Sequence, residues 1–343
     1  MANACILLQR PPRTTPWTTG RLLSAGMFCL AALGLSPSAP AATASEEERS
    51  PTAPVRFAFS KRMFSEVNEN DAQAAMKAWG QAISSERNIP FDPAVRILTG
   101  TEAIAAAVRD QLIDVVTLPT DEYWEVSSMV PLGSIVFGTN GNQITEQYVL
   151  LVRGDSEIQR LADLRGHSLV VFLNTRTILA PTWLEIELLQ HQLGRAAQFW
   201  GRVTESTKLL RVILPVFFRQ ADACLVSLRG FETMVELNPQ IGRQLKILAK
   251  SEPVIPALLC FRGDYLSAYQ EKIIVEATRV NETPAGRQTM ALFQAERLLR
   301  GDPASLASTC ALLELHRGLC AAASGAQPGD SALRPVIAAS GRN

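Results

Sequence analysis

Short apolar, β-branched runs alternate with helix-like segments along the first part of this chain. The runs that predict strands are 55–60, 95–98 and 114–118. Between them, in 71–87 and 104–112, apolar residues recur every three or four positions, the spacing of helices that pack one face on a sheet. Strands that alternate with helices favour a parallel α/β sheet, because parallel neighbours need a crossover connection.

The alternation breaks at two runs, 133–138 and 146–153, which resemble strands without a helix between them. This break predicts two lobes: lobe 1 comprises residues 55–145 and 250–300, and lobe 2 comprises residues 146–249. We expect each lobe to be a mainly parallel sheet flanked by helices. Further strands are predicted at 168–172, 222–227, 245–249 and 257–261, and helices at 208–218, 231–237, 264–279 and 284–299.

The two ends of the chain are predicted to lie outside the lobes. Residues 1–44 have the order of a secretory signal peptide: three arginines, the apolar run 22–35 and a final Ala-Thr-Ala. That run has 14 residues, fewer than the roughly 20 that span a membrane. We expect cleavage after Ala44 and export to the periplasm; an uncleaved anchor is the alternative. Residues 301–343 predict a C-terminal helix and, over 321–343, a disordered tail.

The charge of the exported chain limits its possible partners, and its cysteines predict which thiols are buried or bridged. Removing three of the 33 basic residues leaves 30 against 33 acidic ones, a net charge near −3 without a long basic run. Nucleic acid is therefore not an expected partner. Cys224 and Cys260 lie in apolar runs and predict buried thiols. Cys310 and Cys320 flank a helical segment, and in an oxidising compartment we expect a disulfide between them.

The sequence lacks the signatures of common enzyme classes. Its three histidines, His167, His191 and His316, lie in separate segments without a metal-ligand spacing. It contains no G-x-S-x-G, no Walker loop and no G-x-G-x-x-G. We therefore expect no catalytic residue, no metal and no cofactor.

Polar residues follow several predicted strands, at the ends where open α/β sheets bind ligands. In lobe 1 these residues are Ser60, Lys61, Thr99, Thr101, Thr120 and Tyr123. In lobe 2 they are Asn174, Thr175, Arg176 and Thr177, after which Pro181 opens a helix. Helix N-termini and guanidinium groups attract anions, so we expect a small anionic ligand, with Arg176 facing it from a surface loop. Helix capping is the alternative role for each hydroxyl, and an ion pair on the outer surface is the alternative for Arg176.

Over about residues 55–295 the chain resembles the periplasmic solute-binding proteins of phosphate, phosphite and phosphonate ABC transporters. The matching segments are VRFAFS, VRILTGTEAIAAAVRDQLIDVVTLPTDEYWEV, LADLRGHSLVVFLN, ADACLVSLRGFETMVELNPQI, LKILAKSEPVIPALLCFRGDYL and TPAGRQTMALF. The resemblance implies a type II periplasmic-binding fold, in which two α/β lobes are joined by two crossover segments and close on the ligand by a hinge motion.

The resemblance also implies roles for single residues. Tyr123 stands where the family has a binding tyrosine, and Thr101 where phosphonate binders often have another. Residues 174–177 take the place of the family's Ser-Thr-Ser-Gly phosphate loop but do not match it. Asp222 aligns with an aspartate near the ligand. The ligand implied is a small phosphonate- or phosphate-like anion.

The implied function is that of a monomeric binding protein that delivers its solute to an ABC permease in the inner membrane. A periplasmic sensor subunit that presents its ligand to a membrane kinase is one alternative. An enzyme of the same fold is another; hydroxymethylbilane synthase, for example, carries its cofactor on a cysteine. No general base stands beside Cys260 in the sequence, which argues against the enzyme.

Overall fold

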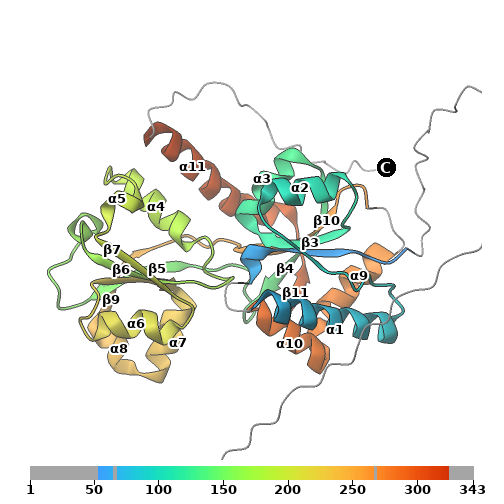
Figure 1. The fold of residues 1–343 in the computed structure, drawn as a ribbon. Helices are drawn as coiled ribbons and strands as arrows, with labels where there is room; N and C mark the ends of the chain where they lie inside the picture. The colour runs from blue at the N-terminus through green and yellow to red at the C-terminus, as the bar shows by residue number, and fades with distance from the viewer. Residues whose placement is uncertain (1–52, 65–67, 266–268, 324–343) are drawn as a thin grey trace, which may run out of the picture. The chain divides into compact units, whose positions relative to one another are not determined.

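The structure, a computed structural model, describes residues 53–64, 68–265 and 269–323 (Figure 1). The predicted signal peptide and the tail from residue 324 onward lie outside the described residues. In the part that is described, no helix has the length and apolar character needed to cross a membrane. The described chain forms two sheets flanked by helices, so the predicted two-lobed α/β class is confirmed.

The first sheet, with its helices, forms lobe 1 and has the strand order β11-β4-β10-β3-β1-β2. Its strands are β1 (Phe57–Ser60), β2 (Arg96–Leu98), β3 (Val115–Pro119), β4 (Leu132–Thr139), β10 (Ala257–Arg262) and β11 (Arg297–Arg300). Its helices are α1 (Glu69–Arg87), α2 (Thr101–Arg109), α3 (Thr120–Met129), α9 (Tyr269–Thr278) and α10 (Pro284–Leu292). Strand β1 is buried on both faces: Ala58 packs with α2, while Phe57 and Phe59 pack with α1 and α9.

The second sheet forms lobe 2 in the same way, with the strand order β7-β6-β8-β5-β9. Its strands are β5 (Tyr148–Arg153), β6 (Ser168–Phe172), β7 (Arg202–Ser206), β8 (Ala223–Ser227) and β9 (Leu245–Lys250). Its helices are α4 (Ala180–Gln190), α5 (Ala196–Phe199), α6 (Leu209–Phe217), α7 (Leu228–Leu237) and α8 (Pro239–Gln244). In β6, Leu169 and Val171 pack beneath α4, whereas Val170 and Phe172 pack beneath α6 and α7.

Short 3₁₀ turns and one long helix complete the described chain. The turns are η1 (Lys61–Met63), η2 (Leu161–Leu164), η3 (Val280–Glu282) and η4 (Pro303–Leu306). Turn η2 is followed by Gly166 at φ 76°, where the chain turns into β6. The last helix, α11 (Ala307–Ala323), packs against α3 of lobe 1 and α4 of lobe 2.

Both sheets are mixed rather than mainly parallel. Strand β1 pairs in parallel with β2 and β3, and β6 pairs in parallel with β7 and β8. However, β10 runs antiparallel to β3 and β4, and β5 runs antiparallel to β8 and β9. These are the strands by which the chain enters lobe 2 and returns from it. The strands divide as the proposed lobes 55–145 with 250–300 and 146–249 do, and those boundaries stay a prediction.

Two edge strands, β7 and β11, are missed by the sequence patterns. Strand β7 reads RVTES and is mostly exposed, so it lacks an apolar signal. Strand β11 falls inside the helix predicted at 284–299, which is wrong beyond Leu292. Gln294 has a positive φ of 53°, and the chain then turns into β11 against β4. The start of the predicted tail also differs, because residues 321–323 belong to α11.

The predicted disulfide between Cys310 and Cys320 is wrong. Both residues lie on α11, and neither forms a disulfide. Ten residues along an α-helix rise about 15 Å, whereas bridged Cα atoms lie roughly 5.5–6 Å apart. Cys224 and Cys260 are buried, as predicted, and burial raises the pKa of both thiols.

Candidate ligand-binding site

The carboxyl ends of β1, β2 and β3 meet at one edge of the lobe 1 sheet. Ser60 is paired in register with Leu98, and Phe59 with Thr117. Thr99 and Thr120, the residues that follow β2 and β3, therefore lie at the same edge as Ser60. Helices α2 and α3 both begin there. The structure thus brings together the predicted lobe 1 residues that directly follow strands.

The N-terminus of α2 is the most open part of this edge. Gly100 stands at the N-cap with φ 86°, which a residue without a Cβ adopts freely, and no side chain of the described residues caps the helix there. A Cβ at Gly100 would meet nothing within 4 Å. Thr99 is exposed beside it and Thr101 is half-buried. The first N–H groups of α2 are therefore placed to receive an anion.

The rest of the lobe 1 edge combines a serine cap with one buried and one partly exposed acidic group. Ser60 is fully buried, and its Oγ accepts a hydrogen bond from the Arg62 N–H at 3.2 Å, while Lys61 is exposed. The Arg62 guanidinium lies 2.8 Å from the Asp121 carboxylate. Glu122 is only 5% exposed, and this burial raises its carboxyl pKa. Charge at the edge is thus partly balanced within lobe 1.

Tyr123 lies one turn into α3 and packs against the core of lobe 1. Its ring packs against the apolar cluster under α2 and α3. Burial raises its pKa to about 12, and the neighbouring thiols of Cys260 and Cys310 add to that shift. A ligand-binding role for Tyr123 stays a prediction.

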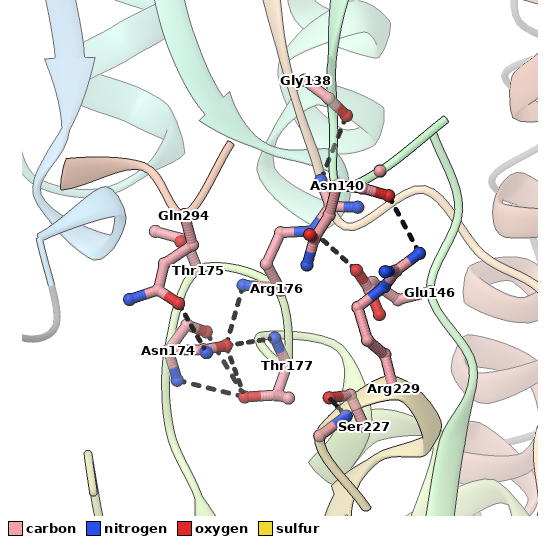
Figure 2. A network of polar contacts seen from close by, with 12 residues as sticks. Gly138, Asn140, Glu146, Asn174, Thr175, Arg176, Thr177, Ser227, Arg229 and Gln294 are labelled. Atoms are coloured by element: carbon pink, nitrogen blue, oxygen red, sulfur yellow. Dashed lines mark hydrogen bonds and ion pairs between the residues drawn. The ribbon is translucent and has the colours of Figure 1, made fainter. Parts of the chain in front are cut away.

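The lobe 2 loop 174–177 satisfies its own hydrogen bonds (Figure 2). The Asn174 side-chain oxygen accepts from the backbone N–H groups of Arg176 and Thr177, at 2.9 Å each. The Thr177 hydroxyl donates to the Phe172 carbonyl at 2.7 Å. All four loop residues are buried. Two of the N–H groups expected to trap an anion here are therefore already bound to the side chain of Asn174.

Arg176 is buried, which contradicts the expectation of a surface-loop residue. Its Nε lies 2.8 Å from Glu146 Oε1, and the two side chains are only 7% and 4% exposed. Its Nη1 donates to the Gly138 carbonyl at 3.1 Å. Its Nη2 is buried and has no hydrogen-bond partner among the described residues. Arg176 is thus neutralised by a carboxylate inside the molecule, and the pair on the outer surface is also excluded.

The same loop is tied to elements of lobe 1 (Figure 2). The Thr175 hydroxyl donates to the Phe293 carbonyl at 3.0 Å, and the Asn174 amide lies 3.3 Å from Gln294 Oε1. Beside the loop, the Arg229 guanidinium donates to the Asn140 carbonyl at 3.0 Å. These bonds join the carboxyl edge of lobe 2 to the ends of α10 and β4.

A mainly apolar cavity of about 70 Å³ lies on the α1 and α10 face of the lobe 1 sheet. Its wall includes Phe59, Met76 and Phe293, and also Thr175 and Arg176 from lobe 2. Loop 174–177 therefore covers apolar surface of lobe 1 as well as forming polar contacts.

Asp222 does not join the other predicted site residues. It precedes β8, whose carboxyl end is Ser227, and five residues of strand span about 16 Å. Its carboxylate accepts from the Ser168 N–H at 2.9 Å and from the Ser168 hydroxyl at 2.7 Å, and His167 lies 3.4 Å away. Asp222 therefore binds the amino ends of β6 and β8 together at the opposite edge of the sheet.

Glu146 is the important residue that the sequence patterns miss. It stands in the segment that enters lobe 2, and its backbone forms a bridge with Val254 in the returning segment. The sequence carries one signal, an acidic residue two positions before the apolar run of β5. If the Glu146 carboxylate is buried, it needs a buried partner of opposite charge, because burying an isolated charge costs free energy.

Comparison with known proteins shows the family. Residues 63–306, well over half of the chain, match the family model described as "ABC transporter, phosphonate, periplasmic substrate-binding protein". No curated protein matches the chain's sequence.

Solved structures show the same fold at low sequence identity. The XAC2383 protein of Xanthomonas citri, bound to chloride ion, has a TM-score of 0.54 and 17% identity over 77% of this chain and 99% of its own. PA3383 of Pseudomonas aeruginosa, a binding protein component of an ABC phosphonate transporter, has a TM-score of 0.52 and 16% identity, covering 81% and 91%. PhnD1 of Prochlorococcus marinus, in complex with methylphosphonate, has a TM-score of 0.51 and 14% identity, covering 79% and 99%.

These likenesses confirm the predicted type II periplasmic-binding fold. The family match runs from the last residue of η1 to the last residue of η4 and so includes every strand of both sheets except β1. The chain belongs to the family of periplasmic substrate-binding proteins of phosphonate ABC transporters.

Proposed function

We propose that this chain captures a small phosphonate- or phosphate-like anion between its two lobes and delivers it to an ABC permease in the inner membrane. The family match supports delivery to such a transporter, and PhnD1 in complex with methylphosphonate supports the ligand class. We also propose that the signal peptide 1–44 is removed, that the mature chain acts as a monomer in the periplasm, and that it performs no catalysis.

The observation that carries the ligand site is the N-terminus of α2 at the carboxyl edge of lobe 1, which no side chain of a described residue caps. Free N–H groups and the helix dipole favour negative charge at this point. Ser60, Lys61, Thr99, Thr101 and Thr120 lie on or beside this edge and are the proposed first contacts.

Lobe 2 has a different role in this proposal. Asn174 already occupies the N–H groups of its loop, and Glu146 already neutralises Arg176. We therefore propose that residues 174–177 position the lobes, while most of the ligand's charge is held by lobe 1. The Arg176 Nη2 group, which no described residue bonds, is the part of that side chain that we propose contacts the solute.

A charge introduced at the α2 N-terminus tests the site. Thr101→Glu places a carboxylate in the first turn, where the helix dipole tolerates it, but there it repels an anionic solute. Methylphosphonate, inorganic phosphate and methanesulfonate are titrated by calorimetry into the purified mature chain. We expect the wild type to bind at least one of the first two, and Thr101→Glu to weaken that binding by at least about tenfold, or 1.4 kcal/mol.

Thr204→Glu is the matched control, because it makes the same charge change on the exposed edge strand β7. It should bind like the wild type. If Thr101→Glu and Thr204→Glu bind the anion equally well, the ligand is held elsewhere. If the wild type binds none of the three anions, the proposed ligand class is wrong.

A further inference from the structure

Helix α11 lies against both lobes, outside the proposed ligand site. In its first turns, the Thr309 hydroxyl oxygen accepts a hydrogen bond from the Ile255 N–H at 2.8 Å. Further along, the Arg317 guanidinium lies over the Trp124 ring of α3, 4.4 Å from the ring centroid. Other residues of the same helix face α4 of lobe 2.

Three side chains of different chemistry converge where α11 meets α4. His316 and Cys320 stand four residues apart on α11 and so share one face of the helix. His316 Nε2 lies 3.0 Å from Glu185 Oε2 of α4 and 3.3 Å from Cys320 Sγ. The three potential ligand atoms all lie within 4.8 Å of one another, and all three residues are partly buried.

Arg195 also forms a side-chain hydrogen bond with Cys320, but hydrogen bonding does not account for the two contacts of His316 Nε2. A neutral imidazole nitrogen either donates or accepts, and a protonated one has a single hydrogen. The same Nε2 atom of His316 therefore cannot form a full hydrogen bond with both Glu185 and Cys320. A cation between the three groups would instead take one lone pair from each of them.

We propose that Glu185, His316 and Cys320 form a zinc site. Zinc binds carboxylate oxygen, imidazole nitrogen and thiolate sulfur at about 2.0–2.3 Å in tetrahedral geometry, which separates neighbouring ligand atoms by roughly 3.3–3.8 Å. The two distances of 3.0 and 3.3 Å need to lengthen only slightly to reach that range. A nitrogen and sulfur donor set does not suit calcium or magnesium, which prefer oxygen.

Arg195 fixes the orientation of the carboxylate at this site. Its Nε lies 2.9 Å from Glu185 Oε1, so the other oxygen, Oε2, is the one turned toward His316. Outer contacts of this kind orient metal ligands and tune the affinity. Glu185 therefore ligates through Oε2 alone, and a water molecule or an external group completes the tetrahedron.

Metal binding here would fasten α11 to lobe 2. The helix also contacts α3 and the segment that returns to lobe 1, through Arg317 and Thr309. Zinc would thus strengthen one end of a helix that bridges the lobes.

Zinc titration of the purified mature chain tests the site. In competition with a chromophoric chelator, we expect one zinc ion per wild-type chain, and at least about 100-fold weaker binding in His316→Gln and in Cys320→Ser. Cobalt bound to the wild type should show a sulfur-to-cobalt charge-transfer band, which Cys320→Ser should lack.

Two variants serve as matched controls. Cys310→Ser removes the other thiol of α11, and His191→Gln removes the histidine that ends α4; both should bind zinc like the wild type. Circular dichroism establishes that each variant is folded. The proposal is overturned if the wild type takes up no zinc, or if folded His316→Gln and Cys320→Ser both bind it as tightly as the wild type.

Discussion

The carboxyl edges of the two sheets follow the same strand–loop–helix plan but use their N–H groups differently. In lobe 1, α2 begins at Gly100 without a side-chain cap from any described residue. In lobe 2, the Asn174 side chain caps the N–H groups of Arg176 and Thr177. The same plan can therefore leave backbone N–H groups available for a ligand, or bind them to a side chain of the protein itself. The difference supports our proposal that lobe 1 holds the ligand's charge while the lobe 2 loop acts as a structural joint.

The strongest test of the structural joint is removal of the Arg176 side chain. Arg176→Ala leaves Glu146 buried at 4% exposure without its cation. Breaking one side of a buried ion pair typically costs about 3–5 kcal/mol, so we expect the free energy of unfolding, measured in urea, to fall by about that amount.

Arg62→Ala supplies the contrast from the lobe 1 edge. Arg62 is 42% exposed and pairs with Asp121 at 2.8 Å and with Glu122 at 3.7 Å. Because solvent reaches its guanidinium, its loss should cost less than about 1 kcal/mol. The double variant Arg176→Met with Glu146→Leu should recover much of the stability, because no unpaired charge remains. Equal losses for Arg176→Ala and Arg62→Ala would contradict the role of Arg176 as a buried joint.

The amino edges of the two sheets offer a second comparison, between Asp114 and Asp222. Asp114 is 3% exposed and binds Arg56 at 2.9 Å and Arg262 at 3.2 Å. Asp222 is 42% exposed in its side chain and binds mainly Ser168. We expect Asp114→Asn to lower the free energy of unfolding by about 1.5–3 kcal/mol and Asp222→Asn by less than about 1 kcal/mol.

The dependence of stability on acidic pH tests the role of Asp114 further. Burial alone would raise the pKa of Asp114, but its hydrogen bonds to Arg56 and the charges of Arg56 and Arg262 hold it below the usual value of 3.8. The native state therefore binds fewer protons than the unfolded chain, and this contribution is present above pH 3.8 and lost as the pH falls through the native pKa. Urea unfolding between pH 5 and 2 should show a smaller loss in Asp114→Asn than in the wild type.

Asn174→Ala tests the self-capped loop directly. It removes the oxygen that accepts from Arg176 and Thr177, and losing a helix cap costs typically about 1 kcal/mol. Asn238→Ala is the control, because Asn238 caps α8 through one exposed bond to the Gln240 N–H. We expect Asn174→Ala to lower the urea midpoint at least as much as Asn238→Ala. No loss in Asn174→Ala would show that water satisfies the loop equally well.

Sequence periodicity predicts most of the fold because buried strands need apolar runs whatever their partners. The run at 168–172 is exactly bounded as β6, and strands β1 to β5 and β8 to β10 fall within two residues of their predicted starts and ends. The edge strands β7 and β11 are not predicted, because they are mostly exposed and bury little apolar surface. Strand direction is not predicted either. A strand that is buried on both faces is a continuous apolar run, whichever direction its neighbour takes.

The site was only partly predictable because partners far apart in sequence decide what a polar residue does. The strand-end position of Thr99 and Thr101 follows from local patterns. The fate of Arg176 depends on Glu146, which is 30 residues away, and on the Gly138 carbonyl. His316 and Cys320 share a helix face, but only the fold brings Glu185 to them. Pairing of this kind is a property of tertiary structure.

The smallest expected effect concerns Glu122, the buried carboxyl group of the lobe 1 edge. Burial raises its pKa above the usual 4.5, although the Ser60 hydroxyl and the Arg62 charge oppose that shift. The native state therefore binds more protons than the unfolded chain at pH values between 4.5 and the native pKa. Stability should fall as the pH rises through that window, and the loss is complete above it.

Glu122→Gln keeps the side chain neutral at every pH, so its stability should fall less than that of the wild type as the pH rises from 4.5 to 8. We expect the two curves to diverge by about 1 kcal/mol or less, since one unit of pKa corresponds to about 1.4 kcal/mol. Glu232→Gln removes an exposed carboxylate from α7 of lobe 2 and should follow the wild type. Parallel curves for Glu122→Gln and the wild type would mean that the lobe 1 edge tolerates the ionised carboxylate without cost.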